Sequence, residues 1–374
     1  MRVLPQRYEE AAMPANGSVR PIRLGRLAGA SLCALLLVAG CAKSEETAAP
    51  PPQGSGGAQA PQAPSGDGPT CAIAQYGGSQ LDLKNAVVGF SQSEKEANPF
   101  RIAETESIKD EAAKVGVKQL LTTNANSQLS KQISDIQDMI NKGAQALIVA
   151  PLNSDGLEPA LAAARAKNIP VLTIDRKVNS TACKDYVAFL GSNFVEQGKR
   201  AAKEMAKALG NKGKVAILLG ASGNNVTTDR TNGFVDELKA SAPDIQVVAQ
   251  QTGEFARDKG QQVMEQIIQA QPDINGVYAE NDEMALGALV ALNGAGKKAG
   301  TDIHIVSIDG TRNAVQKVTT GEVFAVVESN PRFGPLAFQT LQSFLGGQPV
   351  PQNVVISDKL YGKDNATAEL ANAY

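Results

Sequence analysis

Short apolar runs alternate with amphipathic segments along most of the chain. In the first part, four apolar runs of strand length are separated by segments with helical spacing. The predicted strands are Ala86–Phe90, Val117–Thr122, Ala146–Ala150 and Val171–Ile174. The predicted helices between them are Phe100–Val115, residues 129–140 and Leu157–Lys167. This order predicts βαβ units around a parallel sheet.

The same alternation restarts after residue 190. Its predicted strands are Val215–Leu219, Ile245–Gln250, Gly276–Ala279, Ile303–Ile308 and Val323–Val327. Its predicted helices are residues 194–209, 230–240, 257–270 and 283–293. Two such series predict an α/β protein with two doubly wound parallel-sheet lobes.

The chain is expected to pass between the lobes more than once, through a multi-strand hinge. We expect crossings near residues 187–190 and around Glu328–Pro331. Lobe 1 would then combine residues 80–190 with 330–355, and lobe 2 would combine residues 191–328 with 356–374.

The first forty residues have the pattern of a secretory signal peptide. Three arginines precede an apolar run that begins at Leu27 and ends at Gly40, which is too short for a comfortable membrane span. The run ends in Val38-Ala39-Gly40-Cys41, which resembles a bacterial lipoprotein cleavage box. We therefore predict a signal peptide at residues 1–40, lipidation at Cys41 and anchoring to the outer face of the bacterial cell membrane. An ordinary signal with an incidental cysteine is the alternative.

Residues 41–70 are rich in Ser, Glu, Ala, Pro, Gly and Gln. Such a segment has too few large apolar residues to offset its ordering entropy, so we predict a flexible tether. The net charge of the chain is −2 and no basic block is present, which argues against nucleic acid as a partner. We expect a monomer, without a metal or cofactor.

Two of the four cysteines remain for the exported domain, because Cys33 lies in the predicted signal and Cys41 at the predicted lipid site. In an oxidising compartment, Cys71 and Cys183 are expected to form one disulfide. Two free buried thiols are the alternative.

Polar and aromatic residues follow nearly every predicted strand. Since ligands of parallel α/β sheets bind beyond the carboxyl ends of the strands, these residues are candidates for a site in the cleft between two lobes. Carboxylates and amides accept hydrogen bonds from hydroxyls, Arg donates in a fork, and an aromatic ring covers the C–H face of a sugar. The candidates are Gln92, Glu96, Asn98, Phe100, Arg101, Asp175, Arg176, Arg230, Phe255, Asn281, Asp309 and Glu328.

The chain resembles a known family over about residues 84–365. Residues 253–264 (GEFARDKGQQVM), 278–288 (YAENDEMALGA) and 307–310 (SIDG) look like the second lobe of ribose-binding, type I periplasmic sugar receptors. The dipeptides Phe100-Arg101, Asp175-Arg176 and Asp229-Arg230 look most like those of galactofuranose-type receptors, whose relatives also take arabinose and related aldoses. The resemblance implies a soluble receptor that delivers a monosaccharide to an ABC importer and contacts it through the candidates above, Gln92 and Glu96 excepted.

The chain departs from these patterns in places. The loop Ser91–Asn98 is one residue longer than the galactofuranose pattern, which leaves open whether Glu94 or Glu96 faces the cleft. Arg101 and Glu328 replace an aromatic residue and an amide of the ribose pattern, which makes ribose itself less expected. With no Trp in the chain, stacking would fall to Phe100, Phe255 or Phe90.

Structural roles are the alternative for several candidates. Asp175 and Arg176 could form only an ion pair, Asn281 or Asp282 only a helix cap, and Phe255 only a core contact. An arginine or amide accompanies most of the candidate carboxylates, which predicts low carboxylate pKa values and no general acid.

Other classes of protein remain as alternatives. The sequence has no P-loop, dinucleotide-binding turn, nucleophile elbow or metal-spaced His/Cys cluster, so we predict that the protein is not an enzyme. A glycosidase, which needs only two carboxylates, is the enzymatic alternative. A receptor that presents its sugar to a membrane sensor is the other.

Overall fold

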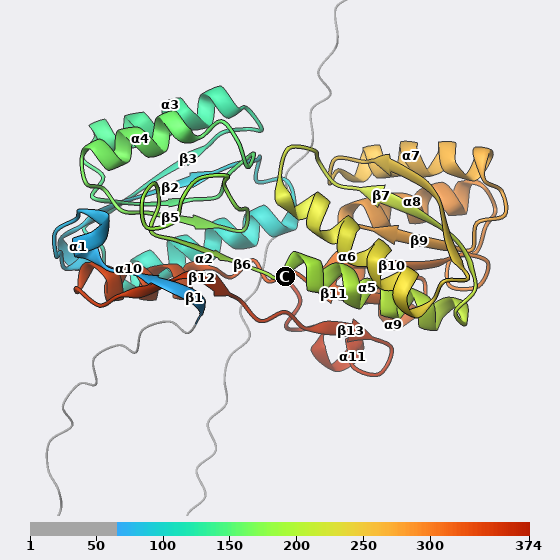
Figure 1. Ribbon diagram of the computed structural model, residues 1–374. Coiled ribbons are helices and arrows are strands. Elements are labelled where there is room, and N and C mark those ends of the chain that lie inside the picture. The colour runs from blue at the N-terminus through green and yellow to red at the C-terminus, as the bar shows by residue number, and fades with distance from the viewer. Residues whose placement is uncertain (1–65) are drawn as a thin grey trace, which may run out of the picture. The chain divides into compact units, whose positions relative to one another are not determined.

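The structure is a computed structural model that describes residues 66–374. The predicted signal peptide, Cys41 and the tether as far as residue 65 lie outside the described residues. The described part contains two α/β lobes, each with its own sheet (Figure 1).

Lobe 1 is built on a seven-stranded sheet with the strand order β1-β12-β6-β5-β4-β2-β3. Its strands are β1 (Asp67–Cys71), β2 (Val87–Gln92), β3 (Gln119–Asn124), β4 (Ala146–Val149), β5 (Val171–Ile174), β6 (Ala188–Gly191) and β12 (Val350–Val355). Only the edge strand β1 runs antiparallel to its neighbour.

Helices cover both faces of this sheet (Figure 1). They are α2 (Pro99–Val115), α3 (Leu129–Asn141), α4 (Glu158–Ala166) and α10 (Gly334–Leu345), with the short α1 (Ile73–Tyr76) and the 3-10 helix η1 (Leu83–Asn85). Successive residues of β4 point to opposite faces. Leu147 belongs to the core under α3 and α4, whereas Ile148 belongs to the core under α2 and α10.

Lobe 2 is built on a six-stranded sheet with the order β13-β11-β10-β9-β7-β8. Its strands are β7 (Gly213–Leu219), β8 (Ile245–Thr252), β9 (Gly276–Ala279), β10 (His304–Asp309), β11 (Ala325–Glu328) and β13 (Leu360–Gly362). Its helices are α5 (Phe194–Leu209), α6 (Asn225–Ser241), α7 (Arg257–Ala270), α8 (Asp282–Gly294), α9 (Arg312–Thr320) and α11 (Ala366–Glu369). The edge strand β13 is antiparallel to β11.

The chain crosses between the lobes three times. The first crossing, residues 192–193, leads from β6 to α5, and the second, residues 329–333, leads from β11 to α10. The third crossing, residues 356–359, joins β12 to β13. The two sheets thus take strands from distant parts of the chain. The exact domain bounds given above stay predictions.

The predicted fold class is confirmed, but some details differ. Each sheet has one antiparallel edge strand, and β1 lies partly within the predicted tether. Its residues lack an apolar pattern, and the strand exists because its backbone pairs with β12 next to Cys71. Helix α6 begins at Asn225 rather than at 230, because the side chain of Asn224 accepts hydrogen bonds from the first turn.

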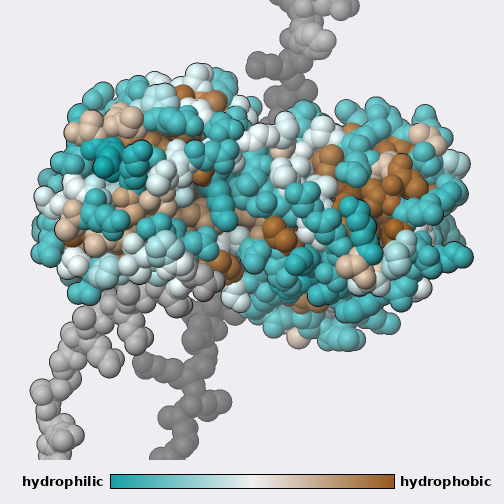
Figure 2. All heavy atoms as spheres, viewed as in Figure 1, coloured by the Kyte–Doolittle hydropathy of each residue, from teal (hydrophilic) through white to brown (hydrophobic). Residues whose placement is uncertain are grey.

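The described surface has few exposed large apolar side chains. They are Ile102, Val195, Val290 and Val355, and hydrophilic residues cover most of the face in Figure 2. None of the helices in residues 66–374 combines the length and apolar character needed to span a bilayer.

Cys71 and Cys183 form a disulfide that joins the end of β1 to the loop between β5 and β6. Both cysteines are buried in the core under α2 and α10. The two cysteines are 112 residues apart in the sequence, so the bond strongly restricts the conformations of the unfolded chain.

The double variant Cys71→Ala/Cys183→Ala should lose about 2–4 kcal/mol of unfolding free energy. Urea unfolding with and without reductant checks this, since reductant should destabilise the original protein and leave the variant unchanged. Two reactive thiols in the denatured, non-reduced original protein would contradict the bond.

Candidate ligand-binding site

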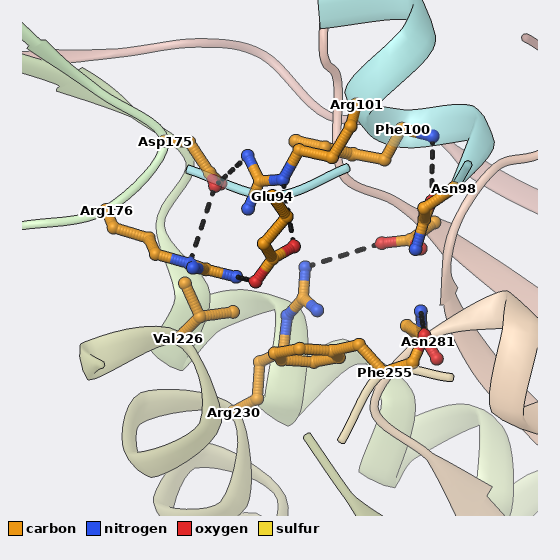
Figure 3. Close-up of a pocket in the computed structure, with 11 residues that line it drawn as sticks. Glu94, Asn98, Phe100, Arg101, Asp175, Arg176, Val226, Arg230, Phe255 and Asn281 are labelled. Carbon is orange, nitrogen blue, oxygen red and sulfur yellow. Dashed lines mark hydrogen bonds and ion pairs between the residues drawn. The ribbon is translucent and has the colours of Figure 1, made fainter. Parts of the chain in front are cut away.

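A pocket lies where the carboxyl ends of strands from both lobes face each other (Figure 3). The space between its side chains, including the part open to solvent, is about 340 Å³. The lining residues are Glu94, Asn98, Phe100, Arg101, Asp175, Arg176, Val226, Arg230, Phe255, Asn281 and Asp309.

The lobe 1 wall is centred on Arg101, in the first turn of α2. Its Nη1 lies 2.8 Å from a carboxylate oxygen of Glu104 and 2.8 Å from one of Asp175, and its Nε donates to Glu94 at 3.2 Å. Arg176 holds the other oxygen of Glu94 at 2.8 Å. Two guanidinium groups and three carboxylates therefore hold one another in place, as Figure 3 shows for those that line the pocket.

The charges of this wall set the protonation of its carboxyl groups. Burial alone would raise the pKa of Glu94, but Arg176 and Arg101 hold it at about 2, so Glu94 stays ionised. Burial raises the pKa of Glu104 to about 7 against the opposing charge of Arg101, and Asp175 adds to the rise. Glu104 lies behind Arg101 and does not line the pocket.

The lobe 2 wall is centred on Arg230 of α6. Its Nε donates to the side-chain oxygen of Gln197 at 2.9 Å, and its Nη1 donates to the backbone oxygen of Glu280 at 2.6 Å. Its Nη2 lies 3.8 Å from Asp309. Helix α5 can lie this close to Arg230 only because residue 198 is a glycine. A Cβ at position 198 would lie 2.2 Å from the backbone oxygen of Arg230.

Two phenylalanine rings line the pocket from opposite lobes. Phe100 comes from the start of α2 and Phe255 from the loop after β8. The guanidinium of Arg101 lies 5.0 Å from the Phe100 ring centre, and that of Arg176 lies 6.0 Å from the Phe255 ring centre. Phe90 is buried in the lobe 1 core and takes no part.

Three lining residues have left-handed backbone conformations. The φ angles are 62° at Asp175, 60° at Phe255 and 141° at Asp309. Residues with a Cβ adopt such angles at a cost, and they do so mainly where the surroundings require it. The two lobes therefore place these side chains in the pocket by constraining the backbone at strand ends.

Both predicted asparagines line the pocket and cap helices as well. The side-chain oxygen of Asn98 accepts from the backbone N–H of Phe100 at 2.9 Å, at the start of α2. The side-chain oxygen of Asn281 accepts from Met284 at 3.0 Å, and its amide donates to the backbone oxygen of Phe255 at 3.1 Å. The structural and functional interpretations of Asn281 are compatible.

Three predicted site residues do not line the pocket. The Gln92 side chain is fully buried and donates to Glu104 and Thr105, because β2 extends to residue 92 and directs it into lobe 1. Glu96 is exposed, and Glu94 occupies the pocket in its place. Glu328 accepts from the backbone N–H of Lys359 at 2.8 Å and from the Tyr361 hydroxyl at 3.1 Å, so it binds the third crossing and β13 instead.

Two further expectations are wrong. Asp282 is no helix cap, because its buried carboxylate accepts hydrogen bonds from Ser307, Gly310 and Thr311. Loss of this side chain should therefore cost more unfolding free energy than loss of a helix cap.

The expectation of low pKa values for the candidate carboxyl groups does not hold for all of them. Burial raises the pKa of Asp309 well above its usual value, with Arg230 opposing the rise.

Two lining residues, Val226 and Glu94, are absent from the predicted set. Val226 lies in the first turn of α6, where it was not distinguishable from a core residue. For Glu94 the sequence leaves two options, because the loop length does not show whether Glu94 or Glu96 turns inward.

The pocket contains three guanidinium groups and three carboxyl groups. These groups offer both hydrogen-bond donors and acceptors, which favours a ligand with many hydroxyl groups. Among the described residues, no group of three or more His, Cys, Asp or Glu is arranged to hold a metal ion.

A family model described as a periplasmic binding protein domain matches residues 88–349. The chain belongs to the periplasmic binding protein family. It is 36% identical over 278 residues to the ribose import binding protein of Bacillus subtilis, which is 74% of this chain and 87% of that protein. It is 34% identical to the galactofuranose-binding protein of Escherichia coli over 76% of this chain and 90% of that protein.

Solved structures agree with this family. The periplasmic binding component of the arabinose ABC transporter from Shewanella sp. ANA-3, bound to L-arabinofuranose, has a TM-score of 0.73 and 32% identity, covering 76% of this chain and 95% of that chain. A Mycobacterium smegmatis structure in complex with β-D-fucofuranose also has a TM-score of 0.73, with 36% identity over 77% of this chain and 94% of that chain.

The stability of this periplasmic binding protein should depend on pH through Glu280. Burial raises its pKa from 4.5 to about 7, against hydrogen bonds from Thr231 and Gly220 and the charge of Arg230. The folded protein then holds a proton that the unfolded chain releases above pH 4.5. This contribution to stability is complete below pH 4.5 and is lost as the pH rises through about 7.

Glu280→Gln should therefore reduce the loss of unfolding free energy between about pH 5 and pH 8 by on the order of 2 kcal/mol. Urea unfolding at the two pH values measures the change. Glu106→Gln, at an exposed position on α2, is the control and should behave as the original protein. Equal pH dependence of Glu280→Gln and the original protein would contradict the assignment.

Proposed function

We propose that this protein is an extracytoplasmic receptor that binds one neutral monosaccharide between its lobes and delivers it to an ABC importer. The observation that carries the proposal is the pocket itself, to which both lobes contribute forked donors, carboxyl acceptors and an aromatic ring. A sugar that bridges Arg101 and Arg230 would satisfy donors on both walls at once.

The ligand class that we propose is an aldose of the galactofuranose, arabinose or galactose type. Names of relatives support it, because one is a galactofuranose-binding protein and two solved structures hold arabinofuranose and fucofuranose. The site residues proposed to contact it are those that line the pocket. Phe100 and Phe255 would cover the C–H surfaces of the ring.

Contacts between the lobes support a mechanism in which the protein closes over its ligand. The backbone N–H of Ser154 in lobe 1 donates to the Gly223 oxygen in lobe 2 at 2.9 Å, and that of Lys177 donates to the Asn225 side chain at 2.8 Å. A ligand that prefers the closed arrangement shifts the equilibrium toward it. The importer would then recognise the closed form.

The proposal includes attachment to the membrane and a role without catalysis. Cys41 would carry the lipid, and the segment that follows it would let the lobes reach the importer. Binding rather than catalysis is supported by the relatives, which are named as binding proteins. We also propose that the protein acts as a monomer.

Thermal scanning of the protein against a sugar panel tests the ligand class. A neutral aldose at 100 times its Kd should add about 2.7 kcal/mol of stability. The matching uronic acid and sugar phosphate should add little, because their negative charge would be buried beside Glu94, which stays ionised. Stabilisation by the charged sugars and not by any neutral sugar would contradict the proposal.

Arg101 should be essential for affinity. Arg101→Ala removes one partner of charged hydrogen bonds, at a cost of about 1.5–3 kcal/mol, or one to two decades in Kd. Arg101→Lys should also weaken binding, because one ammonium group cannot replace a planar fork. Calorimetric titration with the best aldose measures both, and Lys109→Ala, exposed on the same helix, is the control. Unchanged Kd in both Arg101 variants would remove this side chain from the site.

A further inference from the structure

One carboxylate contacts all three crossings between the lobes. Asp358 belongs to the third crossing, and its Oδ1 accepts from the Ser192 hydroxyl of the first crossing at 3.0 Å. The same oxygen accepts from the backbone N–H of Asn330, in the second crossing, at 3.0 Å. The arrangement of the three crossings therefore depends on this side chain.

The other oxygen of Asp358 leads toward the pocket. It accepts from the side-chain amide of Gln197, on α5, at 2.9 Å. The side-chain oxygen of Gln197 accepts in turn from Nε of Arg230 at 2.9 Å. Gln197 is only 1% exposed, so water does not replace either hydrogen bond readily.

The chemistry of the two neighbours determines how the amide of Gln197 is turned. An ionised Asp358 can only accept, and Arg230 can only donate. The amide nitrogen must face Asp358 and the amide oxygen must face Arg230. The three side chains thus form a directed chain of hydrogen bonds from the crossings to the pocket.

These hydrogen bonds hold the side of the Arg230 guanidinium that does not face the pocket. Its Nη1 is held by the backbone oxygen of Glu280, and its Nη2 lies near Asp309 at the pocket. With Nε held by Gln197, the orientation of the guanidinium plane depends on where α5 lies relative to the crossings. A change in the crossings would turn the fork that faces the ligand.

We propose that Asp358 and Gln197 are positioning residues that couple the arrangement of the three crossings to the ligand-facing arginine Arg230. This inference rests on the proposed function, in which Arg230 contacts a sugar. It assigns to two residues outside the pocket an influence on both lobe closure and sugar affinity.

Exchanging the hydrogen-bond donor and acceptor between positions 197 and 358 tests the coupling. Asp358→Asn leaves one amide N–H facing another donor, whichever way the new amide turns. Gln197→Glu places two carboxylates against each other. In the double variant, the new amide at position 358 can donate to the new carboxylate at position 197, while the amide oxygen still accepts from Ser192 and Asn330. The new carboxylate can also accept from Arg230.

Each single variant should weaken sugar binding about tenfold, and the double variant should recover most of the loss. Recovery should be incomplete, because Gln197 also donates to the backbone oxygen of Glu328 at 3.3 Å. Without sugar, small-angle scattering should show a changed distribution of lobe separations in each single variant and the original distribution in the double variant. Control substitutions that make the same changes at exposed positions, Gln316→Glu and Asp364→Asn, should alter neither measurement.

The two readouts separate this inference from the proposed function. If the original protein bound no aldose, the proposed function would be wrong, while the scattering of the unliganded variants would still decide the coupling. Single variants that match the original protein in both affinity and scattering would overturn the coupling. So would a double variant no better than the worse single variant, since a purely structural role predicts additive damage.

Discussion

The pairing of buried charges in the cleft is the interaction on which the rest of the structure depends. Three guanidinium groups and three carboxyl groups meet where the two lobes face each other, and an unpaired ion there would cost several kcal/mol. Arg101 alone contacts three carboxylates. Each side chain must therefore be held in one place, and the strand ends, the left-handed backbone at Asp175 and the helix starts all serve that need.

The division of these charges between lobes connects binding to motion. Arg101 and Asp175 belong to lobe 1, whereas Arg230 and Asp309 belong to lobe 2. A neutral ligand with many hydroxyls can pair with both sets without adding charge, which is how it would favour the closed arrangement.

The three crossings extend this dependence beyond the cleft. They lie far apart in sequence, yet hydrogen bonds to Asp358 join them. Lobe closure would change the angles of such segments, so a side chain that belongs to one of them and bonds the other two is placed to respond to it. Gln197 then gives the response a direct path to Arg230.

The sequence by itself determined the two α/β series, the strand ends and most of the pocket residues, because apolar periodicity is local and parallel strands place their carboxyl ends at one edge. It could not determine that Glu94 rather than Glu96 turns inward, or that Gln92 and Glu328 do not line the pocket. Those outcomes depend on where β2 ends and on a strand, β13, more than thirty residues from Glu328. The roles of Gln197 and Asp358 were decided by tertiary structure alone, since hydrogen bonds across 161 residues leave no periodic signal.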